Sequence, residues 1–233
     1  MSENALSFDP TTFSGKVRLF PLPNLVMFPH VLQPLHIFEP RYKAMLEDAL
    51  TDDRLIAMAV LAPGWEKHYE GRPRLRPIAC LGKVVTHQEV EGERYNILLA
   101  GLRRVNILRE LPPDRPFREA LAEIVDDRYP AAAASDRPAL QQRLLDSFRR
   151  FLPNVPEIHQ HLEELLCTGV SLGMLTDLAG YAMQIPIDAK TSLLEEADVD
   201  RRCEALLHML EHAPRQGGAA LGGLKWPPDF SAN

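Results

Sequence analysis

The sequence predicts an α+β fold, with a strand-rich half first and a helical half second. Up to about residue 125, apolar residues fall in short extended runs separated by prolines and glycines, which is typical of strands. From residue 140 onward they recur at every third or fourth position, which is the period of a helix. The charge also changes: residues 1–118 hold 16 Lys and Arg and 14 Asp and Glu, whereas residues 119–233 hold 10 and 18. The net charge therefore falls from +2 to −8.

These changes predict two subdomains and a tail. We expect a strand-rich subdomain at residues 15–126, a helical subdomain at 127–213 and a flexible tail at 214–233. The tail is rich in glycine and proline, as flexible segments often are.

The stretch from Leu19 to Tyr42 opens the strand-rich half. Four prolines interrupt it, and each removes a backbone donor, so we expect short edge strands laid over a core. Pro40 then suits the first position of a helix. We expect Glu39 and Arg41 to cap and orient that helix, and the alternative is that they form a recognition pair. Its apolar face would consist of Tyr42, Met45, Leu46, Ala49 and Leu50.

The remaining elements follow in order. Strands are expected at Leu55–Leu61, Ile78–His87, Arg94–Ala100, Leu102–Glu110 and Phe117–Val125. A Glu-Gly-Glu turn at residues 91–93 joins two of them into a hairpin, and Gly101 permits a bend or bulge. A start signal at Ser135–Pro138 opens the helical half. Apolar stripes then predict helices near residues 140–148, 158–166, 172–179, 189–196 and 199–210.

The composition is that of a soluble globular protein, with 45% hydrophobic and 25% charged residues. No apolar run is long enough to span a membrane, and the N-terminus lacks the pattern of a secretory signal. Three widely separated cysteines suit a reducing cytoplasm, where we expect the protein to act. The net charge of −6 disfavours general nucleic-acid binding, because such binding relies on neutralising phosphates.

The opening stretch also carries a resemblance. Its residues are Leu22, Pro23, Val26, Phe28, Pro29, Pro34, Leu35, Ile37, Phe38, Glu39, Arg41 and Tyr42. They resemble the opening signature of the N-terminal substrate-recognition domain of the ATP-dependent protease Lon, and Arg94–Arg103 is similar to the central hairpin of that family. The resemblance extends over residues 17–210. It implies a PUA-like β-rich subdomain, a pseudo-barrel, followed by a helical bundle.

The resemblance also implies recognition without catalysis. Lon joins this domain to an ATPase and a protease domain, but this sequence contains no GxxxxGK[ST] phosphate loop and no segment resembling the Ser/Lys protease. We therefore expect a non-catalytic protein of protein quality control, without cofactor or metal. Its partners would be unfolded or damaged polypeptides with exposed apolar segments, with a protease as a second candidate partner. The sequence leaves the partner's identity and the oligomeric state open.

Two motifs offer a hydrolase as an alternative. Gly169–Gly173 fits the G-x-S-x-G elbow, but a helix is expected where the elbow needs a strand, and Ser171 could simply cap the next helix. His208, Glu211 and His212 fit the H-x-x-E-H zinc motif, but only one downstream carboxylate remains as a third ligand. Histidines at a helix C-terminus are also favoured by the helix dipole alone.

A basic loop offers a second alternative, an RNA- or small-molecule-binding module. The residues are Trp65, Tyr69, Arg72, Arg74, Arg76 and Lys83. Basic and aromatic side chains together can bind RNA, whereas the competing interpretation is a solvated loop.

The candidate peptide-binding residues are Met27, Phe28, Trp65 and Tyr69. Methionine and aromatic side chains suit a promiscuous site, because they repack around different partners and offer large contact areas. Since the proline-broken stretch cannot pair along its full length, we expect some of its apolar side chains to face outward. The alternative is that Met27 and Phe28 are core residues.

Overall fold

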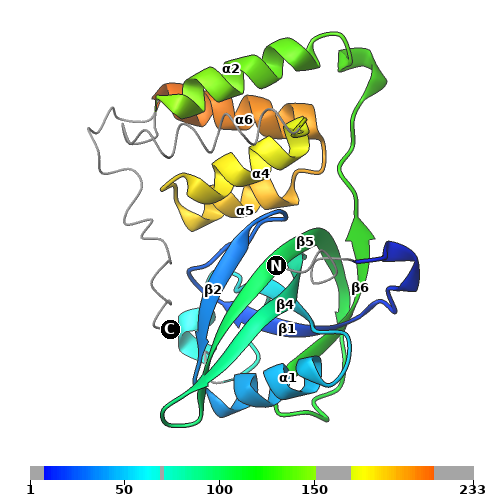
Figure 1. Ribbon diagram of the computed structural model, residues 1–233, viewed down its shortest axis with the longest axis vertical. Helices are drawn as coiled ribbons and strands as arrows, with labels where there is room; N and C mark the ends of the chain where they lie inside the picture. Colours follow the sequence, from blue (N-terminus) through cyan, green and yellow to red (C-terminus); the bar gives the residue numbers. More distant parts are fainter. Residues whose placement is uncertain (1–7, 69–70, 151–168, 213–233) are drawn as a thin grey trace. The chain divides into compact units, whose positions relative to one another are not determined.

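The computed structural model describes residues 8–68, 71–150 and 169–212, and its backbone divides into two compact units between Val125 and Asp126. We call the described part before this division the strand-rich unit and the part after it the helical unit (Figure 1). Apart from one helix at Pro40–Leu50, the strands come first and the helices second, so the predicted α+β fold is confirmed. No helix within the described ranges is both long enough and apolar enough to cross a membrane.

The strands of the strand-rich unit form one sheet. As described, they are β1 Lys16–Leu22, β2 Leu32–Ile37, β3 Leu55–Val60, β4 Ile78–Val90, β5 Arg94–Glu110 and β6 Arg118–Val125. The order is β2-β5-β4-β3-β1-β6, and β5 also pairs with β6, so the sheet closes into a ring with β2 added beside β5. Closure depends on β5, which is 17 residues long and bent, and which pairs with β2 along its first part and with β6 along its last part (Figure 1).

A bulge lies at Gly101 of β5, as the sequence predicted. The register between β4 and β5 shifts there and leaves Leu102 as the extra residue. The segment between β1 and β2 crosses β5 at this point, where the His30 N–H donates to the Gly101 carbonyl oxygen at 2.9 Å. A Cβ on Gly101 would lie 2.1 Å from the carbonyl oxygen of Phe28. The crossing therefore requires glycine.

Helix α1, Pro40–Leu50, begins at the predicted proline and packs its predicted apolar face into the core. The buried residues of this helix are Tyr42, Met45, Leu46 and Ala49. Alternate residues of β1 enter two separate apolar clusters, with Phe20 in the cluster that contains α1 and Leu19 in the other. This division follows from the two-residue period of a strand.

The two strands that contain proline differ in their pairing. β2, with Pro34, pairs with β5 alone in the described residues, which confirms an edge strand. β1 is not the edge strand that was predicted, because it pairs with β6 over Lys16–Leu19 and with β3 over Leu19–Leu22. Pro21 lies in the part of β1 that pairs with β3 alone, so its missing N–H does not interrupt the hydrogen bonds between β1 and β6.

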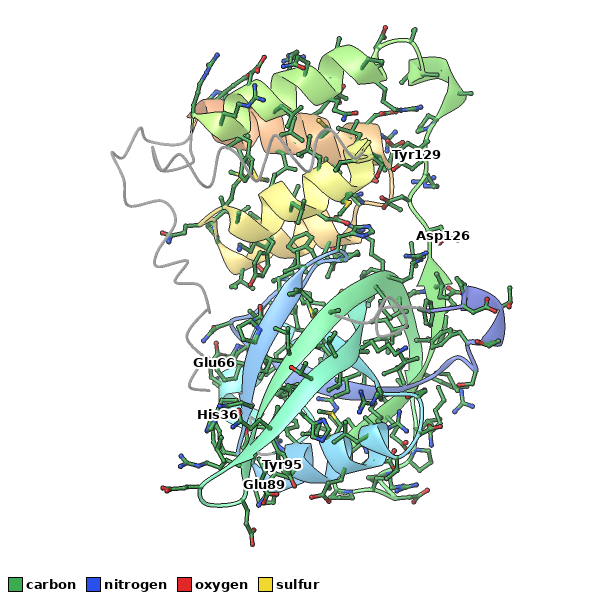
Figure 2. The ribbon with its side chains drawn as sticks, viewed as in Figure 1. His36, Glu66, Glu89, Tyr95, Asp126 and Tyr129 are labelled. Atoms are coloured by element: carbon green, nitrogen blue, oxygen red, sulfur yellow. The ribbon has the colours of Figure 1, made fainter. Side chains whose placement is uncertain are left out.

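The helical unit contains α2 Arg137–Arg149, α4 Leu172–Ala182, α5 Ile187–Glu195 and α6 Val199–His212. Each confirms a predicted stripe; α6 buries Val199, Cys203, Leu206, Leu207 and Leu210. The helix predicted at 158–166 and the tail at 214–233 lie outside the described residues. Figure 2 labels Asp126 directly after β6 and Tyr129 farther along the connection to α2.

Candidate functional site

A pocket rich in arginine lies in the strand-rich unit, and we call it the arginine pocket. Its volume is about 240 Å³. It is lined by Pro21, Arg41, Tyr42, Gly71, Arg72, Pro113, Arg115, Pro116, Phe117 and Arg118. These residues come from β1, the first turn of α1, the loop before β4, the loop before β6 and the start of β6. Closure of the ring is what brings β6 beside β1 and β5.

The first turn of α1 supplies one arginine and an aromatic wall. Glu39 occupies the N-cap position as predicted, but its side chain makes no capping bond to the backbone. Instead it accepts a hydrogen bond from Arg41 Nε at 2.9 Å, and Arg41 Nη2 lies 2.7 Å from the same carboxylate oxygen. The Arg41 guanidinium lies 4.6 Å from the centroid of the Tyr42 ring. Glu39 and the ring thus fix the position of Arg41.

Tyr42 is buried and anchored at both ends. Its hydroxyl donates to the Pro21 carbonyl oxygen at 3.3 Å, and its ring centroid lies 4.4 Å from that of Phe20. Pro21 belongs to the part of β1 that does not pair with β6, so its carbonyl group can take part in this bond. The aromatic side of the pocket is therefore rigid.

Glu110 at the end of β5 holds two further arginines. It accepts from Arg118 Nε at 2.9 Å, from Arg118 Nη2, and from Arg72 Nη2 at 2.9 Å. Burial raises the pKa of Glu110, but hydrogen bonds from Arg118 and then Arg72 outweigh that effect, and the net shift is downward. Glu110 is therefore a carboxylate at neutral pH, shared between two guanidinium groups.

Arg118 retains unused bonding capacity. It is 8% exposed, and within the described residues its Nη1 is buried without a hydrogen-bond partner. The other two nitrogens are taken by Glu110. A buried donor without a partner is uncommon and unfavourable, so this guanidinium has hydrogen-bonding capacity that the described residues do not use.

Arg115 is the fourth arginine and is half-exposed. Its Nη1 lies 2.8 Å from Asp48 Oδ2, and its guanidinium lies 6.0 Å from the Phe117 ring centroid. Asp48 also pairs with Arg18 at 2.5 Å, so this carboxylate too is shared between two arginines. The pocket thus combines guanidinium groups in excess with aromatic and proline walls, an arrangement suited to an anion that carries an apolar neighbour.

The predicted peptide-binding residues lie elsewhere. Met27 and Phe28 are 1% and 0% exposed, which corrects the expectation of outward side chains and agrees with the core alternative. They are buried because the segment between β1 and β2 crosses over β5 at Gly101. Trp65 is half-buried in a 3-10 turn, Trp65–His68, and Tyr69 lies outside the described residues. Peptide binding by these four residues stays a prediction.

The motifs of the hydrolase alternative have structural roles. The Ser171 hydroxyl accepts from the Met174 N–H at 3.2 Å and so caps α4. The rings of His208 and His212 are stacked at 4.2 Å, and His212 Nδ1 bonds to the His208 carbonyl oxygen at 2.7 Å. In the part of the sequence that the structure describes, no group of three or more His, Cys, Asp or Glu residues could hold a metal ion.

Sequence reasoning missed most of the arginine pocket. Arg41 and Tyr42 were noted in the opening signature and Arg72 in the basic loop, but Arg115 and Arg118 were not singled out. A cluster of prolines and arginines just before the last strand was the available signal, and it gave no indication of which partners would lie nearby.

Comparison with known proteins identifies the family. The family described as the ATP-dependent protease La (LON) substrate-binding domain matches residues 16–212. The chain is 26% identical over 192 residues to Lon protease 2 of Myxococcus xanthus and 27% identical over 192 residues to Lon protease of Anaeromyxobacter dehalogenans. These matches cover 82% of this chain but 23% and 22% of those proteins, so the chain spans about a quarter of their length.

Solved structures agree on the fold. The N-terminal domain of the Mycobacterium avium complex Lon protease matches with a TM-score of 0.66 at 15% identity, covering 85% of this chain and 100% of that one. The Lon N-terminal domain protein from Xanthomonas campestris matches with a TM-score of 0.58 at 18% identity, covering 85% and 99%. Because the family match includes every strand and every helix from α1 to α6 that is described, the chain belongs to the family of Lon substrate-binding domains.

Proposed function

We propose that this chain is a non-catalytic polypeptide-binding protein that recognises exposed apolar segments of unfolded or damaged proteins and is linked to proteolysis. The observation that carries the proposal is the match of residues 16–212 to a substrate-binding domain. The arginine pocket supports it as a preformed hollow on the strand-rich unit, lined in part by prolines and by the rings of Tyr42 and Phe117, which are 4% and 5% exposed. The Ser171 cap and the stacked histidines support a protein without hydrolytic chemistry.

The test compares an unfolded protein with its native form. Reduced α-lactalbumin alkylated with iodoacetamide stays unfolded and gains no charge from the alkylation, so charge does not confound the comparison. We expect the full-length protein to bind the fluorescently labelled unfolded form with micromolar affinity and the native form far more weakly, without hydrolysing ATP or cleaving either form. Absence of measurable affinity for the unfolded form contradicts the proposal.

The link to proteolysis needs a separate experiment. Crosslinking in lysate, followed by identification of captured proteins and RNA, should recover misfolded proteins and a protease. Recovery of RNA in their place would favour the competing nucleic-acid function, for which the arginine side chains are the supporting observation.

A further inference from the structure

We propose that the arginine pocket binds a carboxylate of the polypeptide substrate, with the apolar part of the same residue or its neighbour against Tyr42 and Phe117. This inference rests on the proposed function and names the chemical group that the pocket selects. The carboxylate can be the C-terminus of the polypeptide or the side-chain group of an Asp or Glu, because both offer the same two-oxygen geometry.

The charge of the pocket supports an anionic ligand. In the part of the chain that the structure describes, the ion pairs of its four arginines involve three carboxylates, those of Glu39, Glu110 and Asp48. Glu110 serves two of the arginines, and Asp48 is shared with Arg18 outside the pocket. Among the described residues, the guanidinium groups therefore exceed the carboxylates that pair with them, and an entering carboxylate would restore the balance.

The bonding of Arg118 supports an oxygen acceptor. Its side chain is 9% exposed, and its buried Nη1 has no hydrogen-bond partner among the described residues. The neighbouring guanidinium of Arg72 is bound to Glu110 and to the Leu111 carbonyl oxygen, so its orientation is fixed before any ligand arrives. Because Nη1 is itself buried, a carboxylate oxygen would reach it only once the side chains over it shift, and would then complete the hydrogen bonding of Arg118.

The size of the pocket limits the ligand. Sites for drug-sized ligands and cofactors have volumes of about 300–1,000 Å³, and this pocket has about 240 Å³. It can hold a carboxylate and one side chain, whereas a nucleotide would extend beyond it. The walls of Tyr42, Phe117 and the prolines suit an apolar side chain rather than a sugar.

The experiment uses three labelled peptides that share one unstructured apolar sequence without acidic side chains. The first has a free C-terminal carboxylate, the second is amidated, and the third is amidated and carries one internal Glu. We expect the full-length protein to bind the first or the third at least about tenfold more tightly than the second. Whichever of the two is preferred identifies the source of the carboxylate.

Two variants and a control test the pocket. Arg118→Gln removes the buried donor, and Arg115→Gln removes a half-exposed guanidinium whose loss should leave the fold intact. Both should abolish most of the preference for the carboxylate peptide, measured as the ratio of its affinity to that of the amidated peptide. Arg74→Gln, an exposed arginine of the same loop as Arg72 that does not line the pocket, should retain the preference.

The outcomes separate the two proposals. Equal binding of all three peptides, or a preference that both pocket variants retain, overturns the carboxylate pocket and leaves polypeptide binding standing. Failure of the wild-type protein to bind any of the peptides or the unfolded protein overturns both. RNA is also added as a competitor of the labelled peptide. If RNA competes more strongly than the unlabelled free-carboxylate peptide, and this competition is lost in Arg115→Gln, the pocket binds phosphate and the proposal is overturned.

Discussion

Two buried arginines, Arg202 in the helical unit and Arg118 in the strand-rich unit, are bonded in different ways. Arg202 is 0% exposed, and each of its nitrogens has a partner. The partners are the Thr176 hydroxyl at 2.8 Å, the Glu196 carbonyl oxygen at 2.8 Å and both oxygens of Asp127 at 2.9 and 2.8 Å. Arg118 has one carboxylate, shared with Arg72, and an Nη1 without a partner in the described residues.

The difference contrasts a structural arginine, Arg202, with Arg118, which we propose binds a ligand. Arg202 fastens the connection after β6 to α4 and α6, and Gly173 lets that connection pack closely, since a Cβ there would lie 2.2 Å from Asp127 Oδ2. Four of the five N–H donors of Arg202 are used in these bonds, and all three of its nitrogens are engaged. Arg118 is buried to nearly the same degree but lines a pocket, and its buried Nη1 has no hydrogen-bond partner among the described residues. Satisfaction of hydrogen bonds, rather than burial, therefore distinguishes the two roles.

The largest loss of stability is expected from Arg202→Met. The substitution leaves the carboxylates of Asp127 and Asp177 without this guanidinium, and removal of one partner from a buried ion pair costs about 3–5 kcal/mol. Urea unfolding followed by circular dichroism measures the loss. The control is Arg201→Met, an exposed neighbour on the same helix, which should change the free energy of unfolding by less than about 0.5 kcal/mol. Similar losses in the two variants would mean that the Arg202 network contributes little.

A smaller loss is expected from Arg118→Gln. Glu110 keeps its hydrogen bond from Arg72, so only the bonds from Arg118 are lost, at about 1–3 kcal/mol. The same urea titration, made beside that of Arg202→Met, measures the difference. If Arg118→Gln destabilises the protein as much as Arg202→Met does, Arg118 is structural and the contrast between the two arginines is wrong.

Lys190 shows that a hydrogen bond in the helical unit does not always offset the cost of burying a charged group. Its Nζ donates to the Tyr181 carbonyl oxygen at 2.6 Å, yet burial lowers the pKa of Lys190 from 10.5 to about 8. Below pH 8 the folded protein holds a buried charge at a cost. Between pH 8 and 10.5 the folded state has released the proton while the unfolded state still binds it, so stability rises with pH across this window.

The measurement for Lys190 compares urea unfolding of the wild type and Lys190→Met at several pH values. Relative to the variant, the free energy of unfolding of the wild type should rise by on the order of 1–3 kcal/mol between the neutral and the alkaline end of the series. Other groups that titrate in this range are common to both proteins and cancel. Parallel pH profiles would show that the hydrogen bond to Tyr181 offsets the burial of the ammonium group.

Elements that depend on local spacing were predictable from the sequence. The start of α1 at Pro40, the bulge at Gly101 and the apolar stripe of α6 each follow from a few neighbouring residues. The sequence did not decide whether Met27 and Phe28 are buried, although both are. The pattern of a segment broken by prolines does not reveal whether other segments cover its side chains. The arginine pocket was not predictable either. Its residues come from five places in the sequence and meet only because β5 bends and the sheet closes.

The smallest effect is expected from Ser171, and it decides whether the G-x-S-x-G motif is catalytic. As an N-cap, the Ser171 hydroxyl satisfies the Met174 N–H, and Ser171→Ala should lower the free energy of unfolding by about 1 kcal/mol. Ser171→Asp restores a capping oxygen and places a negative charge at the helix start, so it should recover most of that loss. A nucleophile behaves differently, since neither Ala nor Asp at this position can replace an attacking hydroxyl. Hydrolysis of an ester or peptide substrate that is present in the wild type and absent from both variants would make Ser171 catalytic. Loss of stability in Ser171→Ala alone, with binding of the unfolded protein unchanged in both variants, would assign the serine to the end of α4.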